Sequence, residues 1–289
     1  MTIREKGYAH WDGQLKERRF SWTPITWLGI RLAFRKKYFK FILFSSLVPA
    51  VVFLAGIYIS ERIQDFQYML RGNRQFLEVN PLYFKNYLCG DFLLFMMVMI
   101  LVVSGAGLIS DDLKHNSLQL YFARPLSKSG YLIGKANVIV FFLLLLTLVP
   151  GLLFIVFKLL FAGSFRFLAD YPWLPLAVIG YSLFVTGFFC AYTLLFSSLS
   201  KNRRYVSILI FAVYLLSNIL FGFFYENYKK PAYALLSLSA NLQQVGAWFF
   251  RLKPAYAVPW YWSLAVLLAF ALAAAVVLNK KIRGVEVVK

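Results

Sequence analysis

Apolar residues run in long blocks along this chain, and polar residues gather in short segments between the blocks. Such blocks are typical of membrane-spanning segments rather than of the one-sided faces of soluble helices. Because lipid offers the backbone no hydrogen-bond partners, we expect each spanning block to be an α-helix. The chain is therefore expected to be an all-α polytopic membrane protein, with a six-helix transmembrane domain over residues 39–278. The predicted spans are Phe39–Ile59, Phe92–Ile109, Leu132–Phe157, Leu174–Leu199, Val206–Phe224 and Pro259–Leu278.

The composition favours the same class of protein. Hydrophobic residues make up 61% of the 289 residues and charged residues only 15%, and the mean hydropathy is +0.66. Soluble domains carry about 25% charged residues, so this chain has too little polar surface for a water-soluble fold. The two cysteines, Cys89 and Cys190, are far apart and fit no metal-binding spacing. Residues 1–38 are mostly polar and basic, so no cleavable signal peptide is expected.

The distribution of positive charge predicts the topology. Most of the 31 lysines and arginines would lie on one side of a six-span chain, and the net charge is +19. That side holds residues 1–38, the segment 107–135, the short connection 201–204 and the basic tail 279–289. The positive-inside rule places it, with both termini, in the cytoplasm. The longer loops 60–88 and 225–258 are then extracytoplasmic. Basic clusters beside apolar blocks indicate contact with anionic lipids and no nucleic-acid partner.

The stretch Trp22–Phe39 mixes bulky apolar residues with positive charge. Thr23 can cap a helix that has Pro24 at its first position. An amphipathic helix lying in the cytoplasmic interface fits this pattern, with its bases directed toward lipid phosphates. The stretch is equally well interpreted as the flank of the first span. Its basic residues are Arg31, Arg35, Lys36 and Lys37.

The loop 225–258 contains the sequence YALLSLSANLQQVGAWFF, in which Ser237 or Ser239 can start a short helix with an apolar face. Such a helix is either a lid at the outer membrane surface or a packed connector. In the third span, Pro150 and Gly151 predict a kink toward the outer end.

The spans hold almost no ionisable residues in their interiors, since Asp91 and Lys158 lie near span ends. Ion-coupled transporters and ion pores use intramembrane charges or carbonyl filters, so an autonomous secondary transporter or channel is disfavoured. The sequence around Gly134 and Lys135 does not match the phosphate-binding loop GxxxxGK[ST]. A nucleotide that drives this protein would therefore be bound by another subunit. His10 and His115 have no metal-ligating partners at usable spacing.

The polar segment 107–135 reads GLISDDLKHNSLQLYFARPLSKSGYLIGK. Ser110 can cap a short helix whose first turn contains Asp111 and Asp112. Arg124 precedes a proline, which disfavours helix there, and Ser127 can cap the helix that enters the third span. The pattern predicts a short cytoplasmic helix between two spans. A well-capped loop would not explain the apolar run at 120–122 beside the charges, whereas a helix that docks against a soluble partner would.

This segment resembles the cytoplasmic coupling segment of type-2 ATP-binding cassette (ABC) permeases. In that family an acidic residue after the second span is followed by a short helix ending in Arg-Pro, and then by Tyr-Leu-x-Gly-Lys. The six spans, the N-terminal amphipathic helix, the helical loop before the last span and the basic tail also resemble the family. The corresponding elements here are Ser110-Asp111-Asp112, Leu118-Gln119-Leu120, Arg124-Pro125 and Tyr131-Leu132-Ile133-Gly134-Lys135.

The resemblance implies the transmembrane subunit of an ATP-driven transporter, an exporter in a bacterial inner membrane. Such a subunit is no enzyme itself: it pairs with a second permease and two ATPase subunits, which bind the ATP and Mg. No cofactor is expected in this chain. The cargo is not indicated. By carry-over, the residues that face the ATPase are Asp111, Asp112, Lys114, Leu118, Tyr121 and Arg124.

Two alternatives belong to other classes. A membrane-integral transferase could bind Mg²⁺ and a diphosphate through Asp111 and Asp112, but it would require a second, facing acidic cluster. A non-transporting membrane anchor could recruit an ATPase through the same segment 107–135.

Overall fold

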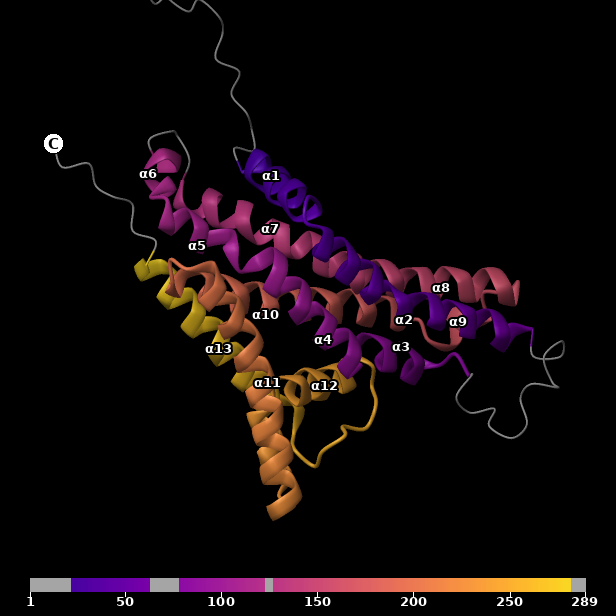
Figure 1. The fold of residues 1–289 in the computed structure, drawn as a ribbon. Helices are drawn as coiled ribbons and strands as arrows, with labels where there is room; N and C mark the ends of the chain where they lie inside the picture. Colours follow the sequence, from indigo (N-terminus) through magenta and orange to yellow (C-terminus); the bar gives the residue numbers. More distant parts are fainter. Residues whose placement is uncertain (1–21, 63–77, 123–126, 282–289) are drawn as a thin grey trace, which may run out of the picture.

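The structure is a computed structural model that describes residues 22–62, 78–122 and 127–281. All regular secondary structure in these ranges is helical (Figure 1). The first helices are α1 (Thr23–Phe34), α2 (Lys37–Glu61), α3 (Pro81–Leu88), α4 (Asp91–Ile100), the π-helix η2 (Leu101–Gly105), α5 (Gly107–Lys114) and α6 (Ser117–Phe122). The others are α7 (Lys128–Leu146), α8 (Leu148–Ala162), α9 (Arg166–Asp170), α10 (Leu174–Leu199), α11 (Arg203–Tyr228), the 3₁₀-helix η3 (Pro231–Leu236), α12 (Leu238–Phe249) and α13 (Trp260–Lys281).

Six helical segments within the described ranges are long and apolar enough to cross a membrane, which confirms the predicted all-α polytopic membrane protein. The second and third are longer than predicted, with 34 and 35 residues. A helix of that length measures about 50 Å, against about 30 Å of hydrocarbon, so both extend beyond the membrane core. The segments are Lys37–Glu61, Pro81–Lys114, Lys128–Ala162, Leu174–Leu199, Arg203–Tyr228 and Trp260–Lys281.

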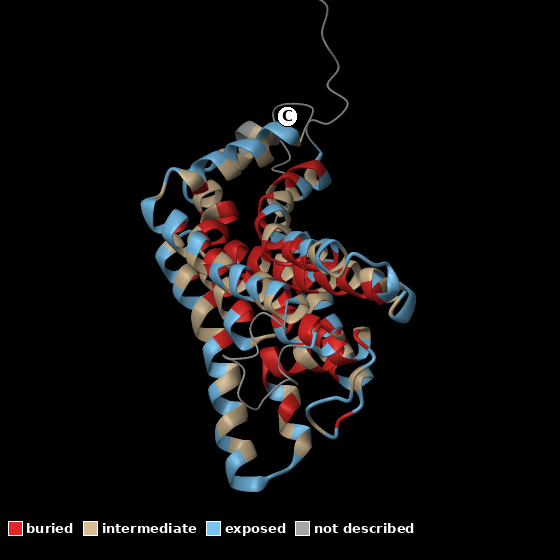
Figure 2. Cartoon of the chain, turned by 90° about the vertical axis from the view of Figure 1, so that its right-hand side faces the viewer, coloured by how far each residue is buried: buried red, intermediate tan, exposed pale blue. Residues whose placement is uncertain are grey.

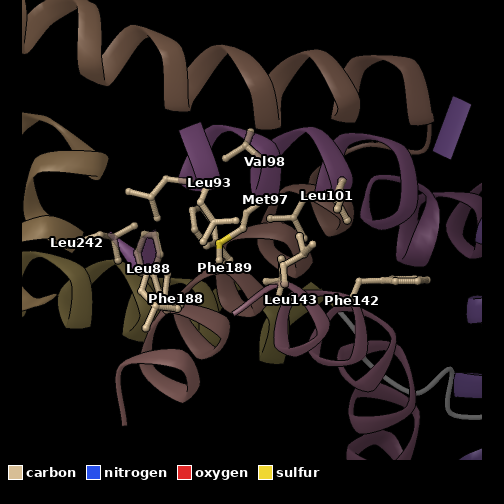
Figure 3. Close-up of a cluster of buried hydrophobic side chains, with 14 of the residues drawn as sticks. Leu88, Leu93, Met97, Val98, Leu101, Phe142, Leu143, Phe188, Phe189 and Leu242 are labelled. Atoms are coloured by element: carbon tan, nitrogen blue, oxygen red, sulfur yellow. The ribbon is translucent and has the colours of Figure 1, made fainter. Parts of the chain in front are cut away.

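Helix α10 forms the centre of the bundle, because it packs against α5, α7, α8, α11 and α13. Half of its most apolar stretch is buried, against 17% for that of α11. Buried residues gather along the middle of the bundle, and exposed residues cover its outer helices (Figure 2). The core cluster in Figure 3 joins side chains of α3, α4, α7, α10 and α12 around η2. Its labelled members are Leu88, Leu93, Met97, Val98, Leu101, Phe142, Leu143, Phe188, Phe189 and Leu242.

The third span is divided into α7 and α8 at Thr147, whose backbone has φ −110° and ψ −64°. Pro150 lies in the first turn of α8, where a missing backbone N–H costs least. The break therefore accompanies the Pro150–Gly151 pair, as predicted, but it falls near the middle of this long helical segment rather than toward its end. Gly151 lets α8 approach α10 closely: a Cβ atom there would lie 2.6 Å from Val178 Cγ1.

The N-terminal stretch forms a helix of its own, because Lys36 has an extended backbone (φ −84°, ψ 122°) that separates α1 from α2. The helix begins at Thr23 with Pro24 in its first turn, so its N-cap is Trp22 and not, as predicted, Thr23. Its inner side packs on α7, where Thr26 Oγ1 donates to Gly134 O at 2.9 Å. Trp27, Leu28 and Leu32 of α1 are exposed. Helix α1 is therefore a separate helix with exposed apolar residues rather than a simple extension of α2.

Helix α12 follows η3 and lies inside the bundle rather than over it. Ser237 is its N-cap, and the hydroxyl oxygen of Ser237 accepts a hydrogen bond from Ala240 N at 3.0 Å. Most residues of α12 are buried, and the helix packs against α10, α11 and α13. Of the two predicted possibilities, the packed connector is therefore the one observed.

Candidate functional site at the charged end of the bundle

Helices α5 and α6 lie at the same end of the bundle as α1, the start of α11 and the end of α13 (Figure 1). We call this the charged end, and define it by Lys36, Asp111, Asp112, Lys135 and Arg203. Lys128 Nζ fixes the end of α13 there, since it donates to Asn279 O at 2.6 Å and to Asn279 Oδ1 at 2.7 Å.

Helix α5 is a direct continuation of the second span. It ends at Lys114, and the chain reverses at Asn116, which has a left-handed backbone with φ 51°. A separate helix, α6, follows. The expected N-cap at Ser110 is therefore wrong: Ser110 is buried inside helical chain, and its Oγ donates to Ala106 O at 2.8 Å. The acidic pair consequently lies late in α5 rather than in a first turn. The expected cap at Ser127 is observed, because its Oγ accepts from Gly130 N at 3.1 Å.

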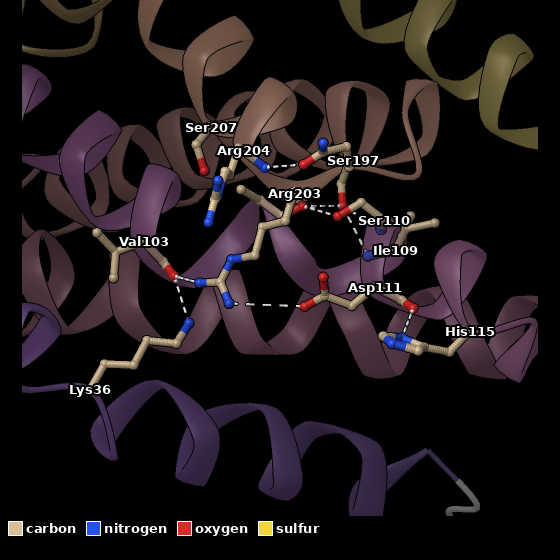
Figure 4. A network of polar contacts seen from close by, with 12 residues as sticks. Lys36, Val103, Ile109, Ser110, Asp111, His115, Ser197, Arg203, Arg204 and Ser207 are labelled. Atoms are coloured by element: carbon tan, nitrogen blue, oxygen red, sulfur yellow. Dashed lines mark hydrogen bonds and ion pairs between the residues drawn. The ribbon is translucent and has the colours of Figure 1, made fainter.

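The π-helix η2 connects α4 to α5 and widens the helical turn by one residue. Ala106 N donates to Leu101 O at 3.1 Å, five residues back, in place of the usual partner four residues back. Two cations bind one carbonyl in this wide turn: Lys36 Nζ donates to Val103 O at 2.9 Å and Arg203 Nη2 at 2.8 Å (Figure 4). The start of α2 and the start of α11 are thereby joined to the second span.

Ser197 of α10 stabilises the turn that follows η2. Its Oγ accepts from Ile109 N at 2.9 Å and from Ser110 N at 3.2 Å, and it donates to Ala106 O at 2.9 Å (Figure 4). All four residues are buried. A single hydroxyl therefore pairs with three backbone groups of the second span and fixes α5 on the central helix.

Asp111 and Asp112 bind different cations on different helices. Asp112 Oδ2 lies 2.6 Å from Lys135 Nζ, and their side chains are only 13% and 11% exposed. Tyr131 Oη also donates to Asp112 Oδ2 at 2.7 Å. Asp111 Oδ2 lies 3.9 Å from Arg203 Nη1, at the limit of an ion pair, and both side chains are more than one third exposed. Asp112 therefore joins α5 to α7 firmly, whereas Asp111 is loosely held.

Tyr121 connects α6 to the contact that Asp112 makes between α5 and α7. Its ring centroid lies 5.4 Å from that of Tyr131, and Lys135 Nζ lies 5.7 Å from the Tyr121 centroid. Burial, with the nearby negative charge of Asp112, raises the pKa of the Tyr121 hydroxyl above its usual value of 10.0. Leu118 also packs against the core. The inner side of α6 is thus held against α7 by an aromatic pair and a cation.

The structure divides the six predicted coupling residues. Asp112, Leu118 and Tyr121 face inward and hold the segment together. Asp111 is half-exposed, and Lys114 is exposed. Arg124, its break with Pro125, and the side chains of Leu120 and Phe122 lie outside the described residues.

Sequence reasoning did not identify the joints at the charged end. Lys36 was expected to face lipid phosphates, but it points inward to Val103 O, while Arg31, Arg35 and Lys37 are exposed. The role of Arg203 as the partner of Asp111 was not foreseen. No local pattern marks the π-helix, so nothing in the sequence indicated that Val103 O would be shared.

The geometry of the acidic pair does not favour a metal-dependent transferase. The two carboxylates bind separate cations, Arg203 and Lys135, instead of converging on one point. Within the described part of the chain, no group of three or more histidine, cysteine or acidic residues is placed to hold a metal ion. In comparisons with known proteins, no family model and no curated protein matches this chain.

Proposed function

We propose that this chain is the transmembrane permease subunit of an ATP-driven type-2 ABC transporter, an exporter. In this proposal the charged end faces the cytoplasm, and α5 with α6 is the coupling segment on which a separate ATPase subunit acts. The membrane is a bacterial inner membrane. A second permease copy or a homologous permease completes the transport path, and the ATPase subunits bind the ATP and Mg.

The observation that carries the proposal is the way α6 is fixed to the spans. Helix α5 continues the second span beyond the length that hydrocarbon requires, and α6 folds back on it after Asn116. Asp112 and Lys135 then connect this unit to the third span, and Ser197 connects it to α10. Since these contacts are largely shielded from solvent and hydrogen-bonded, a force applied to α6 would move several spans together rather than deform a loop.

The outward residues of the segment are suited to docking. Lys114 is exposed, with the half-exposed Asp111 on the same short helix. Charges of this kind form charge-assisted contacts with a partner at little cost to the fold. The inward residues would hold α6 against α7 while the ATPase subunit moves it.

Co-purification with the ABC ATPase encoded beside the gene tests the proposal. We expect the wild type to bind this ATPase and to change its ATP turnover in liposomes. The double variant Asp111→Lys, Lys114→Glu reverses the exposed charges and should lose the complex while keeping the elution profile of a folded bundle. Lys253→Glu is the matched control, because it reverses an exposed charge between α12 and α13.

Equal ATPase capture by the double variant and by the wild type would contradict the assignment of the coupling segment. Capture of the ATPase without any effect on ATP turnover would favour the non-transporting anchor instead. Failure of the wild type to bind the ATPase would overturn the permease proposal itself.

A further inference from the structure

A cavity of about 340 Å³ lies at the charged end, between α1, η2, α5 and the start of α11. Its volume is in the range of small-molecule sites, about 300–1,000 Å³. One wall is apolar and comes from α1; another is polar and shares three charged residues with the network of Figure 4. The apolar wall is defined by Ile25, Leu28 and Leu32, and the polar wall by Lys36, Asp111 and Arg203.

Positive charge exceeds negative charge around this cavity. It is lined by the cations Lys36, Lys135 and Arg203 and by the carboxylates Asp111 and Asp112. Lys135 and Asp112 neutralise each other at 2.6 Å, and Asp111 lies 3.9 Å from Arg203. Within the described residues, no carboxylate lies within ion-pair distance of Lys36.

Lys36 and Arg203 share one acceptor. Both donate to Val103 O, at 2.9 Å and 2.8 Å, so two positive charges converge on a neutral oxygen. Burial lowers the pKa of Lys36 to about 8, and the charge of Arg203 contributes to the shift. An anion between the two cations would relieve their repulsion, and Val103 O would still retain one donor if the other turned to that anion.

The rim of the cavity is apolar. Leu28 is 50% exposed and Leu32 47% exposed, and both line the cavity. Trp27, on the same helix, is also exposed. A soluble anion gains nothing from such a rim, whereas the glycerol backbone and first methylene groups of a lipid would cover it. Interface helices bury their apolar side at the boundary between lipid headgroups and acyl chains, where the glycerol backbone also lies.

We propose that this cavity binds an anionic phospholipid, with the phosphate between Lys36 and Arg203 and the acyl chains along the leucines of α1. The excess positive charge favours a headgroup such as phosphatidylglycerol over a zwitterionic one. The lipid would connect α1, the π-helix and α11 beside the coupling segment. The site depends only on this chain and stands independently of any ATPase partner.

Lipid binding to the purified full-length chain in detergent tests the site, with native mass spectrometry as the readout. We expect phosphatidylglycerol to bind more tightly than phosphatidylcholine with the same acyl chains. Lys36→Gln and Arg203→Gln should each weaken phosphatidylglycerol binding on the order of tenfold. Lys40→Gln and Arg204→Gln remove exposed charges one turn or one residue away and should leave binding unchanged. Lys36→Arg keeps the charge and should retain the lipid.

Two further measurements keep the test decisive if a polar-wall variant does not fold. Leu32→Glu places a carboxylate at the exposed rim and should repel the phosphate, whereas Trp27→Glu, on the same helix but outside the cavity lining, should not. Glycerol 1-phosphate and inorganic phosphate should not displace the lipid. Equal binding by cavity and control variants would overturn the proposal. So would equal affinity for phosphatidylcholine, or displacement by free phosphate, which would indicate a soluble-anion site.

Discussion

Two adjacent aspartates at the charged end have opposite environments. The side chain of Asp112 is only 13% exposed and lies against Lys135 and Tyr131, whereas that of Asp111 is 44% exposed and only approaches Arg203. The difference arises because consecutive residues of a helix point about 100° apart, so one lies over α7 and the other toward α11. A motif that reads as one acidic pair therefore contains one structural residue and one accessible residue.

We expect Asp112→Asn to destabilise the bundle much more than Asp111→Asn. Removing the charge of Asp112 leaves Lys135 buried without a counter-ion, a loss of about 3 kcal/mol. The pair of Asp111 with Arg203 is long and exposed, so its loss costs less than about 1 kcal/mol. Denaturant unfolding of the detergent-purified variants, followed by tryptophan fluorescence, measures both. Similar destabilisation by the two variants would contradict the described difference in burial.

Lys36 should make stability depend on pH. Its pKa falls from 10.5 to about 8 in the folded chain, because of burial and then the charge of Arg203, against the opposing charge of Asp111. Between these values the unfolded chain binds the additional proton, so stability rises with pH in that window. We expect the unfolding temperature of the wild type to increase relative to that of Lys36→Gln between about pH 8 and about pH 10.5. Parallel pH curves for the two proteins would exclude the effect.

At the scale of elements, the π-helix determines how the second span meets its neighbours. A wide turn shifts the register of α5 relative to α4 and leaves backbone groups that need partners. Ser197 pairs with the groups that face α10, and Lys36 and Arg203 pair with Val103 O. The same local irregularity thus provides the joint to the central helix and the polar wall of the cavity.

We expect Ser197→Ala to cost about 1–3 kcal/mol, since the buried N–H groups of Ile109 and Ser110 and the carbonyl of Ala106 would lose this partner. Ser198→Ala is the matched control: its hydroxyl donates to Leu195 O of its own helix, at 2.7 Å. Unfolding in a denaturant series compares the two. If Ser198→Ala were equally destabilising, the joint at Ser197 would have no special role.

For the whole molecule, burial separates inner from outer spans. The second, third and fourth spans supply most of the core, while α2, α11 and α13 turn most of their surface outward. The outer faces are apolar, with side chains such as Phe44 on α2 and Phe223 on α11 exposed. Lipid, or a second permease in the proposed assembly, would cover them. The bond from Lys128 to Asn279 places the end of α13 beside the start of α7.

The orientation in the membrane is testable with two single cysteines. Lys114 lies at the charged end, and Lys253 precedes α13, whose other end is at the charged end. If the charged end is cytoplasmic, a membrane-impermeant maleimide should label Lys253→Cys in intact cells and Lys114→Cys only after permeabilisation. The unsubstituted chain is the control, because Cys89 is buried and Cys190 half-buried. The reverse labelling pattern would place the charged end outside.

Much of the fold could be predicted from the chain alone. Apolar blocks of about the length that a bilayer requires identified all six spans, and Ser237 and Ser127 are the N-caps of α12 and α7 as predicted, whereas the N-cap of α1 is Trp22 instead of Thr23. These signals are local, since a span or a cap depends on residues a few positions apart. The cap expected at Ser110 failed for the same reason: α5 had no free beginning there, because the second span continues through it.

The candidate site could be predicted only as a segment. Its position between two spans and its acidic pair are visible in the chain, and so is the motif that resembles ABC permeases. The ion-pair partners of the two aspartates cannot be identified in this way. Lys135 and Arg203 are distant from them in sequence, and each is one of many positive residues. Which of the two neighbouring aspartates is less exposed depends on the direction in which each side chain points after the π-helix. No sequence pattern indicates that π-helix.

The sequence by itself determined the membrane-spanning helices, their number and the accumulation of positive charge at one end, because hydrophobicity and charge act residue by residue. Tertiary structure alone decided the placement of Lys36 and Arg203 on Val103 O, the burial of Asp112 and the cavity beneath α1. These features require segments distant in sequence to meet at distances of a few ångströms. Such meetings follow from the packing of whole helices around α10, and not from the order of residues within any one of them.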